Sequence, residues 1–394
     1  MRPTSTNNAA KRPLPARTRR ARPMLLGAAF AVTLGGVACS ATNPIKATID
    51  GGATTNVGCS NVPTLAQDSY CSSCTPPAYE SPNACTDARP VNACCAYVQA
   101  PKVEITRSTG LHYFSSTDPT VDLGCLSNPG TQGSPKMVTL TGFVKLFSSG
   151  QDSAGVKVEI HKETPPGSGT LGDVVGTAVT TLSDDVADPP QMPLVSWLSK
   201  CQDPGCKFRS YTYAGVPTET PLIIHTFDAN ATGAWADLYD YNVYFANSAV
   251  DATTNQVHYD ASAVASTDLN TVASVAGGFT IKAMDGLIAG EVHDCSDMRL
   301  SGVMVDTDQA HEGPMFYFSD SESDPIPDSS RALQGLGTSD LGLFGALNVP
   351  TGAPVRISAV GKYMGQDTLV GTYVVRVFPG AVTALSLRGR RPFQ

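Results

Sequence analysis

Two stretches of this chain carry the same series of strand and turn signals, and this repetition constrains the fold more than any other feature. Residues 138–146 and 286–293 alternate between apolar and polar side chains, and each is followed by a polar turn and a second alternating segment. A period of two is typical of a β-strand with one buried and one solvated face. Glycines mark the same places in both copies, 13 positions apart at Gly142 and Gly155 and 12 apart at Gly290 and Gly302.

A second pair of matching segments lies further along the chain. Gly215-Val-Pro-Thr and Asn348-Val-Pro-Thr each lead through a further proline into an apolar segment. Because both anchors occur in the same order, they indicate an internal duplication. We therefore predict an all-β protein with two tandem β-modules, at residues 136–250 and 286–390.

The expected strands follow from these patterns. We expect the first two strands of the second module to form a hairpin around a polar turn. The expected strands of the first module are 138–147, 156–161, 174–182, 208–213, 222–227 and 241–245. Those of the second are 287–293, 303–307, 315–318, 343–347, 354–360, 372–377 and 381–387. Between the modules, residues 251–285 are a predicted linker with a short helix at 268–277, where Leu269, Val272 and Val275 share one side and Gly277 ends it.

The N-terminal segment, 1–38, has the organisation of a signal peptide. A basic segment without acidic residues precedes an apolar segment, Met24 to Val37, which is shorter than a spanning helix requires. The apolar segment ends in Leu34-Gly-Gly-Val-Ala-Cys39, which resembles a bacterial lipoprotein processing site, although Gly36 stands where that pattern prefers leucine. We therefore expect an exported protein, lipid-anchored through Cys39 to the membrane of the cell envelope. Cleavage by an ordinary signal peptidase and release of the chain is the alternative.

The cysteines support export. Eleven cysteines without Cys39 leave ten, an even number that suits disulfides in an oxidising compartment. After a predicted tether at 39–58, a small disulfide-rich module at 59–100 holds six of them, for which 15 connectivities are possible. These six are Cys59, Cys71, Cys74, Cys85, Cys94 and Cys95.

The other four cysteines lie outside this module. Cys201 and Cys206 enclose Pro-Gly and are expected to close a tight loop. By elimination, Cys125, in a predicted connection at 101–135, pairs with Cys295 at the start of the second module. This pair would limit motion between the modules.

The charge of the chain argues against nucleic acid as a partner. Removal of the segment 1–38 takes away seven basic residues and no acid, which leaves 20 Lys and Arg against 35 Asp and Glu, a net charge of −15. A chain this acidic is repelled by phosphate backbones.

The order of these signals resembles the carboxypeptidase regulatory-like domain. The matching features are Gly-x-Val in a first strand, Gly-Val-x-Val in a second, and a later Asn/Gly-Val-Pro-Thr turn. The resemblance implies small transthyretin-like or Ig-like β-sandwiches, which accompany enzymes or surface proteins as structural or binding modules. The whole layout is similar to that of surface lipoproteins of bacteria such as myxobacteria.

Few residues suggest chemistry. Glu291 and His293 share a strand face and could form half of a metal site, but a solvated polar face is the simpler interpretation. An acidic loop offers four carboxylates to calcium, Asp320, Glu322, Asp324 and Asp328. The aromatic segment 235–244 could be a binding platform, although strand core is the expected interpretation.

We therefore expect a non-catalytic protein with a structural or adhesive role in the cell envelope or at the cell surface, without a cofactor. One alternative is a module that binds an envelope glycan or protein through a calcium-dependent loop. The other is an unrecognised hydrolase whose catalytic residues converge across the modules.

Overall fold

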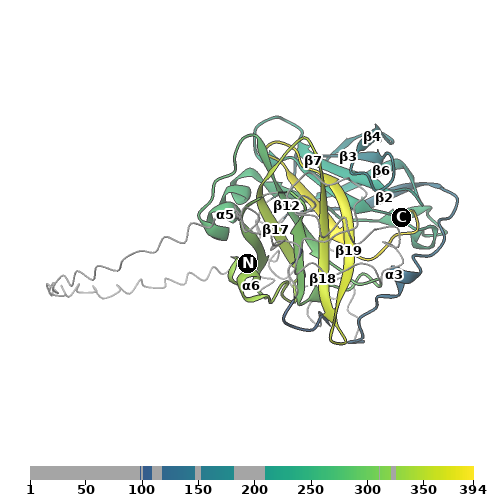
Figure 1. Ribbon diagram of the computed structural model, residues 1–394. Coiled ribbons are helices and arrows are strands. Elements are labelled where there is room, and N and C mark those ends of the chain that lie inside the picture. The colour runs from purple at the N-terminus through teal and green to yellow at the C-terminus, as the bar shows by residue number, and fades with distance from the viewer. Residues whose placement is uncertain are drawn as a thin grey trace, which may run out of the picture. The chain divides into compact units, whose positions relative to one another are not determined.

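The computed structural model describes residues 98, 101–108, 118–146, 152–181, 209–309, 311–320 and 325–394. β-Strands far outweigh helices among them, which confirms the predicted all-β class (Figure 1). None of the helices in these ranges is long and apolar enough to cross a membrane. The predicted signal peptide, the tether and all cysteines of the disulfide-rich module lie outside the described residues, as do Cys201, Cys206, Glu322 and Asp324.

The first module consists of two sheets that enclose a core of apolar side chains from alternate strand positions, such as Leu140 and Ile160. β2 is central in one sheet and β3, β7 and β9 form the other. Its strands are β2 (Met137–Leu146), β3 (Val156–Glu163), β4 (Leu171–Val174), β5 (Val179–Thr180), β6 (Arg209–Pro217), β7 (Leu222–Asp228), β8 (Trp235–Ala236), β9 (Leu238–Val243), β10 (Gln256–His258) and β11 (Ala261–Ala265). A 3-10 helix, η3 (Asn247–Ala249), precedes β10.

The second module is built in the same way. One sheet centres on β12, and the other contains β14, β18 and β19. Its elements are β12 (Asp285–Val292), β13 (Leu300–Ser301), β14 (Val303–Thr307), β15 (Glu312–Phe318), β16 (Pro327–Asp328), α6 (Ser330–Gln334), β17 (Leu343–Pro350), β18 (Pro354–Tyr363), β19 (Gln366–Arg376) and β20 (Val382–Leu387). Two short elements precede both modules, β1 (Thr106–Arg107), which pairs with β13, and α3 (Gly124–Ser127).

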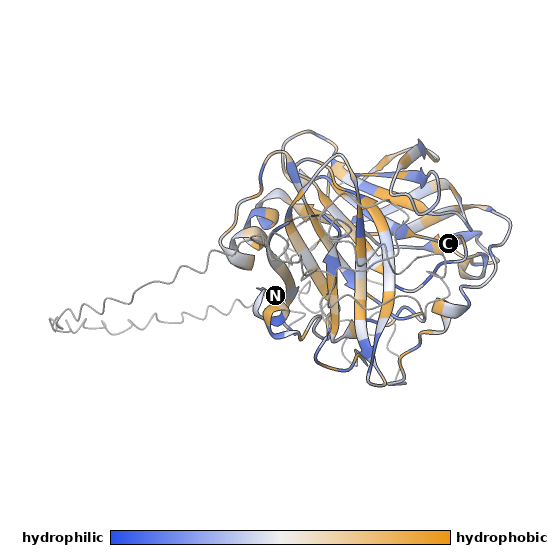
Figure 2. Ribbon diagram, in the orientation of Figure 1, coloured by the Kyte–Doolittle hydropathy of each residue, from blue (hydrophilic) through white to orange (hydrophobic). Residues whose placement is uncertain are grey.

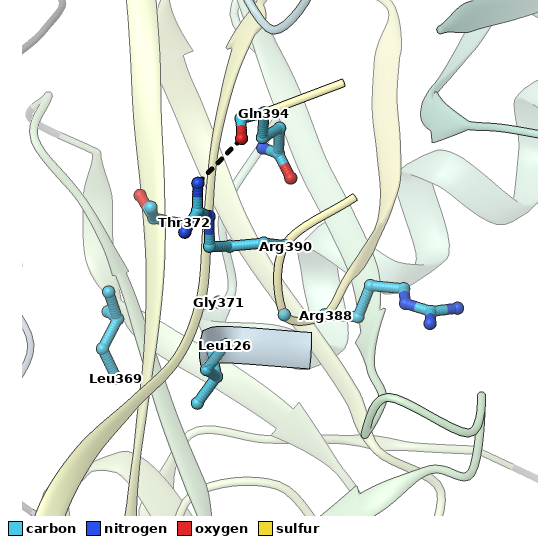
Figure 3. Close-up of a pocket in the computed structure, with 8 residues that line it drawn as sticks. Leu126, Leu369, Gly371, Thr372, Arg388, Arg390 and Gln394 are labelled. Atoms are coloured by element: carbon cyan, nitrogen blue, oxygen red, sulfur yellow. Dashed lines mark hydrogen bonds between the residues drawn. The ribbon is translucent and has the colours of Figure 1, made fainter. Parts of the chain in front are cut away.

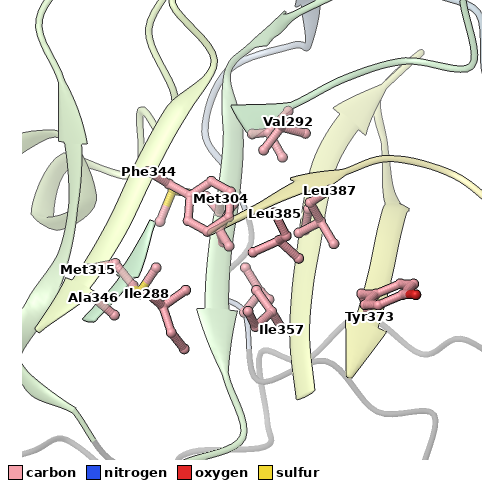
Figure 4. Close-up of a cluster of buried hydrophobic side chains, with 14 of the residues drawn as sticks. Ile288, Val292, Met304, Met315, Phe344, Ala346, Ile357, Tyr373, Leu385 and Leu387 are labelled. Atoms are coloured by element: carbon pink, nitrogen blue, oxygen red, sulfur yellow. The ribbon is translucent and has the colours of Figure 1, made fainter. Parts of the chain in front are cut away.

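The core of the second module lies between its two sheets. Ile288, Phe344 and Leu385 from one sheet meet Ile357 and Tyr373 from the other (Figure 4). Apolar residues, orange in Figure 2, occur on strands of both sheets. Most consecutive positions of β17, β18 and β19 are buried, so burial of apolar side chains is what holds the sheets together.

Strand pairing repeats between the modules, so the duplication predicted from the sequence is present in the fold. β2 pairs antiparallel with β6 and parallel with β11, as β12 pairs antiparallel with β17 and parallel with β20. β3 pairs with β7 and β7 with β9, all antiparallel, as β14 pairs with β18 and β18 with β19. The last strand of each module thus lies parallel to the first.

The repeated glycines serve the same purpose in both copies. A Cβ atom on Gly142 would lie 1.9 Å from the carbonyl oxygen of Tyr259, and one on Gly290 would lie 2.3 Å from that of Leu385. Both positions therefore need glycine, because the backbone of the neighbouring segment occupies the space that a Cβ atom would take.

The predicted hairpin at the start of the second module is wrong. β12 and β14 lie in different sheets, since β12 pairs with β17 and β20 whereas β14 pairs with β18. The polar turn between them carries the chain from one sheet to the other. Gly302, with a left-handed φ of 82°, lies at this crossing directly before β14. Alternation indicates only which side chains are buried. Two strands that face each other from different sheets alternate as regularly as two strands that pair within one sheet.

The predicted linker differs from the observed chain in its first half. Residues 256–265 form β10 and β11, which pair parallel with β2 and complete the first module. The predicted helix is present as α5 (Ser266–Gly277), and its C-cap is the left-handed Gly278. The buried side of α5 consists of Leu269, Ala273 and Ala276. Val275 lies on another side of the helix and is exposed.

Candidate functional site

The two modules meet along a shared strand. β20 of the second module pairs on one side with β12 and on the other, parallel, with β9 of the first, from Val382 opposite Leu238 to Leu385 opposite Tyr241. A ten-stranded sheet therefore runs through both modules, with β12, β20, β9, β7 and β3 in consecutive positions. The backbone hydrogen bonds of a sheet, rather than a linker, connect the modules.

Buried polar contacts cross this junction beside the sheet. Glu163 of β3 is almost fully buried and accepts hydrogen bonds from the Tyr373 hydroxyl at 2.5 Å and from the backbone N–H of Gly169 at 2.6 Å. Burial raises the pKa of Glu163, and these two hydrogen bonds partly offset the rise. Asn242 Nδ2 of β9 donates to the Ser386 carbonyl oxygen of β20 at 2.8 Å.

Cys125 and Cys295 form the disulfide that elimination predicted, with a Cα–Cα distance of 5.6 Å. It joins α3 to the turn after β12. Buried charges surround it: Asp294 accepts from Arg107 Nε at 2.8 Å and Nη2 at 2.6 Å, and from the backbone N–H of Asp122 at 3.1 Å. The connection at 101–135 is therefore fastened to the second module by covalent and ionic contacts together.

A polar cluster that the sequence reasoning did not identify lies on the outward side of β3 and β7. Glu159 is directly opposite His225 in the strand register, and His161 follows two positions later on the same face of β3. His161 Nε2 lies 2.9 Å from Glu159 Oε1, and His225 Nδ1 lies 4.0 Å from the same oxygen. One candidate ligand atom from each of the three residues lies within 4.8 Å of the others. We call these residues the Glu159 cluster.

An aromatic row holds His225 in place. Its ring stacks between Phe227, with centroids 4.4 Å apart, and Tyr239, with centroids 4.1 Å apart. Tyr239 stacks in turn on Phe378 of the second module, at 4.1 Å. Lys157 Nζ lies 5.2 Å from the Phe227 ring centre at the other end of the row. His225 therefore has little freedom to rotate.

Glu291 and His293 are the pair that the sequence singled out, and the structure favours the simpler interpretation. His293 Nε2 lies 2.8 Å from Glu291, while Arg299 binds both carboxylate oxygens, through Nε at 3.0 Å and Nη2 at 2.6 Å. Burial alone would raise the pKa of Glu291, but Arg299 and His293 outweigh it and hold the pKa well below its usual range. Arg299 therefore already neutralises the Glu291 carboxylate, and His225 does not lie beside this carboxylate.

Two residues of the predicted calcium loop are described, and both have local roles. Asp328 Oδ1 accepts from the Ser330 N–H at 2.9 Å and hydroxyl at 2.6 Å at the start of α6, and Asp320 Oδ1 accepts from the Asp340 N–H at 3.1 Å. Calcium binding at this loop stays a prediction. In the aromatic segment 235–244, Leu238 and Tyr241 are buried, as the core interpretation predicts.

A small pocket lies between α3, β19 and the C-terminal residues (Figure 3). Across its mouth Arg390 Nη2 donates to the Gln394 backbone oxygen at 2.8 Å. The described residues that line it include no histidine, cysteine or carboxylate, and Thr372, their one hydroxyl side chain, donates to the Ile357 carbonyl oxygen. The residues of this pocket therefore do not form the nucleophile and base of a hydrolase. The lining residues are Leu126, Leu369, Gly371, Thr372, Arg388, Gly389, Arg390 and Gln394.

Comparisons with known proteins add little to this geometry. A scan against protein-family models and a search of curated proteins found no match. Among solved structures, the chain is similar to a variant of the shaft pilin SpaA from Lactobacillus rhamnosus GG, at 10% identity over 65% of this chain and 99% of that one, with a TM-score of 0.19.

Two streptococcal pilins give comparable values. A variant of the major pilin of Streptococcus pyogenes has 8% identity over 64% of this chain and 99% of that one, with a TM-score of 0.15. A streptococcal ancillary pilin has 11% identity over 64% and 68%, with a TM-score of 0.16. Superpositions this poor carry no argument about fold or function, which rest on the chain's own residues.

Proposed function

We propose that this protein is a non-catalytic structural element of the cell envelope in which two β-sandwich modules act as one stiff body. The observation that carries the proposal is the parallel pairing of β20 with β9. Domains joined by a linker move relative to each other by default, since few contacts cross the boundary. Here a relative movement would break a row of backbone hydrogen bonds and expose the buried Glu163.

The stiffness of the pair can be measured with two spin labels introduced as noncanonical amino acids. One replaces Val174 in the first module and the other replaces Met364 in the second, both exposed side chains. Pulsed electron resonance should give a single narrow distance distribution. A pair within the first module, at Val174 and the exposed Met137, is the matched control. A cross-module distribution clearly broader than the control would contradict the proposal.

The location in the envelope rests on the N-terminal sequence. A basic segment, the short apolar segment from Met24 to Val37 and Cys39 close behind it are the features of a lipoprotein precursor. We propose that Cys39 carries the lipid and tethers the modules to a membrane surface. Cells expressing the chain should incorporate labelled palmitate into it, and Cys39→Ala should abolish the label. Equal labelling of the two chains would refute the anchor while leaving the stiffness proposal intact.

A further inference from the structure

We propose that the Glu159 cluster is a binding site for a divalent transition-metal ion, with Glu159, His161 and His225 as ligands. The sequence reasoning assigned no metal to these residues. Two imidazoles and a carboxylate are a ligand set that suits zinc and related ions. This inference goes beyond the structural role proposed above and does not depend on it.

The spacing of the three candidate ligand atoms, which face one another, fits such an ion. Ligand atoms around tetrahedral zinc lie about 3.4 Å apart, given metal–ligand distances of about 2.1 Å. In the cluster, Glu159 Oε1 lies 2.9 Å from His161 Nε2 and 4.0 Å from His225 Nδ1, and the set stays within 4.8 Å. The Glu159 side chain is the most exposed of the three, at 23%.

The ring nitrogens that point away from the candidate ligand position also have surroundings typical of metal-binding histidines. His161 Nδ1 lies 3.1 Å from the Gly172 carbonyl oxygen, which requires Nδ1 to carry a proton. Nε2 then faces Glu159 either as the N–H of an imidazolium or, in the neutral ring, with a lone pair that can bind a metal ion. A lone pair facing a carboxylate oxygen is unfavourable unless a proton or a cation lies between them. Metal-ligating histidines commonly have this arrangement, in which the distal N–H is held by a carbonyl or carboxylate.

His225 has the same arrangement as His161, with the Asp237 carboxylate in place of the Gly172 carbonyl oxygen. Its Nε2 is buried and makes no hydrogen bond within the described part of the chain, and the Asp237 carboxylate lies 3.6 Å from it. A proton on Nε2 would face Asp237 and leave Nδ1 free to bind the ion. Asp237 is therefore assigned as the positioning residue of His225, not as a ligand.

The carboxylate of the cluster has no permanently charged partner among the residues that the structure describes. No lysine or arginine there forms an ion pair with Glu159, and its partners are the two histidines, which carry a charge only when protonated. The side chains of both histidines are 13% exposed, so solvent can supply the fourth ligand as water. The aromatic row fixes the His225 ring, which reduces the entropy lost on binding.

The test is a titration of the full chain, with its disulfides oxidised, with Zn²⁺ in competition with a chromophoric chelator. We expect one ion to bind per chain and to raise the melting temperature by about 5 °C at a hundredfold excess over Kd. The double variant His161→Gln, His225→Gln should weaken binding by at least about 100-fold, and Asp237→Asn by about 10-fold. His258→Gln, which removes a half-exposed histidine elsewhere, is the matched control and should bind as the parent does.

Two further measurements keep the test decisive. Melting curves without metal establish that each variant folds. Absorption of the Co²⁺-loaded chain distinguishes the cluster from unpaired cysteines, because thiolate ligands add intense charge-transfer bands that nitrogen and oxygen ligands lack. Binding of equal strength in the double variant, thiolate bands with Co²⁺, or no binding of Zn²⁺ at all would each overturn the proposal.

Discussion

The chain contains two Glu-x-His pairs with almost the same internal geometry and very different neighbours. Glu159 and His161 on β3 lie 2.9 Å apart, and Glu291 and His293 on β12 lie 2.8 Å apart. Arg299 occupies both oxygens of Glu291, whereas the residue opposite Glu159 is a third potential ligand, His225. The pair alone therefore does not define a site. The third residue beside the carboxylate decides whether the glutamate forms an ion pair with an arginine or can bind a metal ion.

The region around Glu291 and His293 is also cross-linked more strongly than the region around Glu159 and His161. The Cys125–Cys295 disulfide follows it directly and closes a loop with a sequence separation of 170. Replacing both cysteines with serine should lower the free energy of unfolding by about 5 kcal/mol in the chain-entropy model. Chemical denaturation measures this loss. Zinc affinity at the Glu159 cluster should stay unchanged, and a parallel loss there would mean that the two regions are coupled.

Arg299→Met tests the neutralised pair itself. The variant leaves the partly buried Glu291 without its guanidinium partner and should lower the free energy of unfolding by about 2 kcal/mol. Lys157→Met, at the end of the aromatic row, removes a cation that stacks on Phe227 and should cost only about 0.5 kcal/mol. Losses of equal size would contradict the claim that Glu291 depends on a positively charged side chain more than the first pair does.

The second pair should also make stability depend on pH. Burial lowers the pKa of His293, but the Asp297 and Glu291 carboxylates outweigh it and raise the pKa above its ordinary value of 6.5. The folded state then binds the proton more tightly than the unfolded state. The resulting stabilisation is fully present below about pH 6.5 and is lost as the pH rises through the raised folded value. Denaturation of parent and His293→Gln should differ more at weakly acidic than at alkaline pH, and a constant difference would refute this assignment.

A small effect on stability is also expected from converting the first pair into a copy of the second. His225→Arg places a guanidinium opposite Glu159, as Arg299 stands beside Glu291. Arginine also stacks on aromatic rings, so the free energy of unfolding should change by less than about 1 kcal/mol. Zinc binding should nevertheless disappear. A variant that keeps its zinc affinity would show that His225 is not a ligand.

Much of the fold was predictable because it follows from local pattern. Strand positions, the duplication and the helix before β12 come from periodicity and turn residues, and the pairing of Cys125 with Cys295 comes from counting. The sheet to which each strand belongs was not predictable in this way. β12 and β14 alternate as a hairpin would, yet they face each other across the core.

The Glu159 cluster was missed for a related reason. Glu159 and His161 are visible as a pair in a predicted strand, in the same pattern as Glu291 and His293. Their third partner, His225, is more than sixty positions away and meets them only through the register of β3 with β7. Register is a non-local property, and the alternation of apolar residues fixes which face a side chain occupies without fixing its neighbour. The matching anchors of the duplication align the two copies with each other and leave the register of β3 with β7 open.

The position of β20 has a consequence for how an exported chain reaches its folded state. β9 is flanked by β7 and β20, and β20 comes more than a hundred residues after β9 in the sequence. After the residues of the first module have crossed the membrane, the outer edge of β9 stays open until β20 has followed. An open edge is a template for pairing with other chains. Chains whose export stops before residue 382 therefore keep an open strand edge and are prone to aggregate.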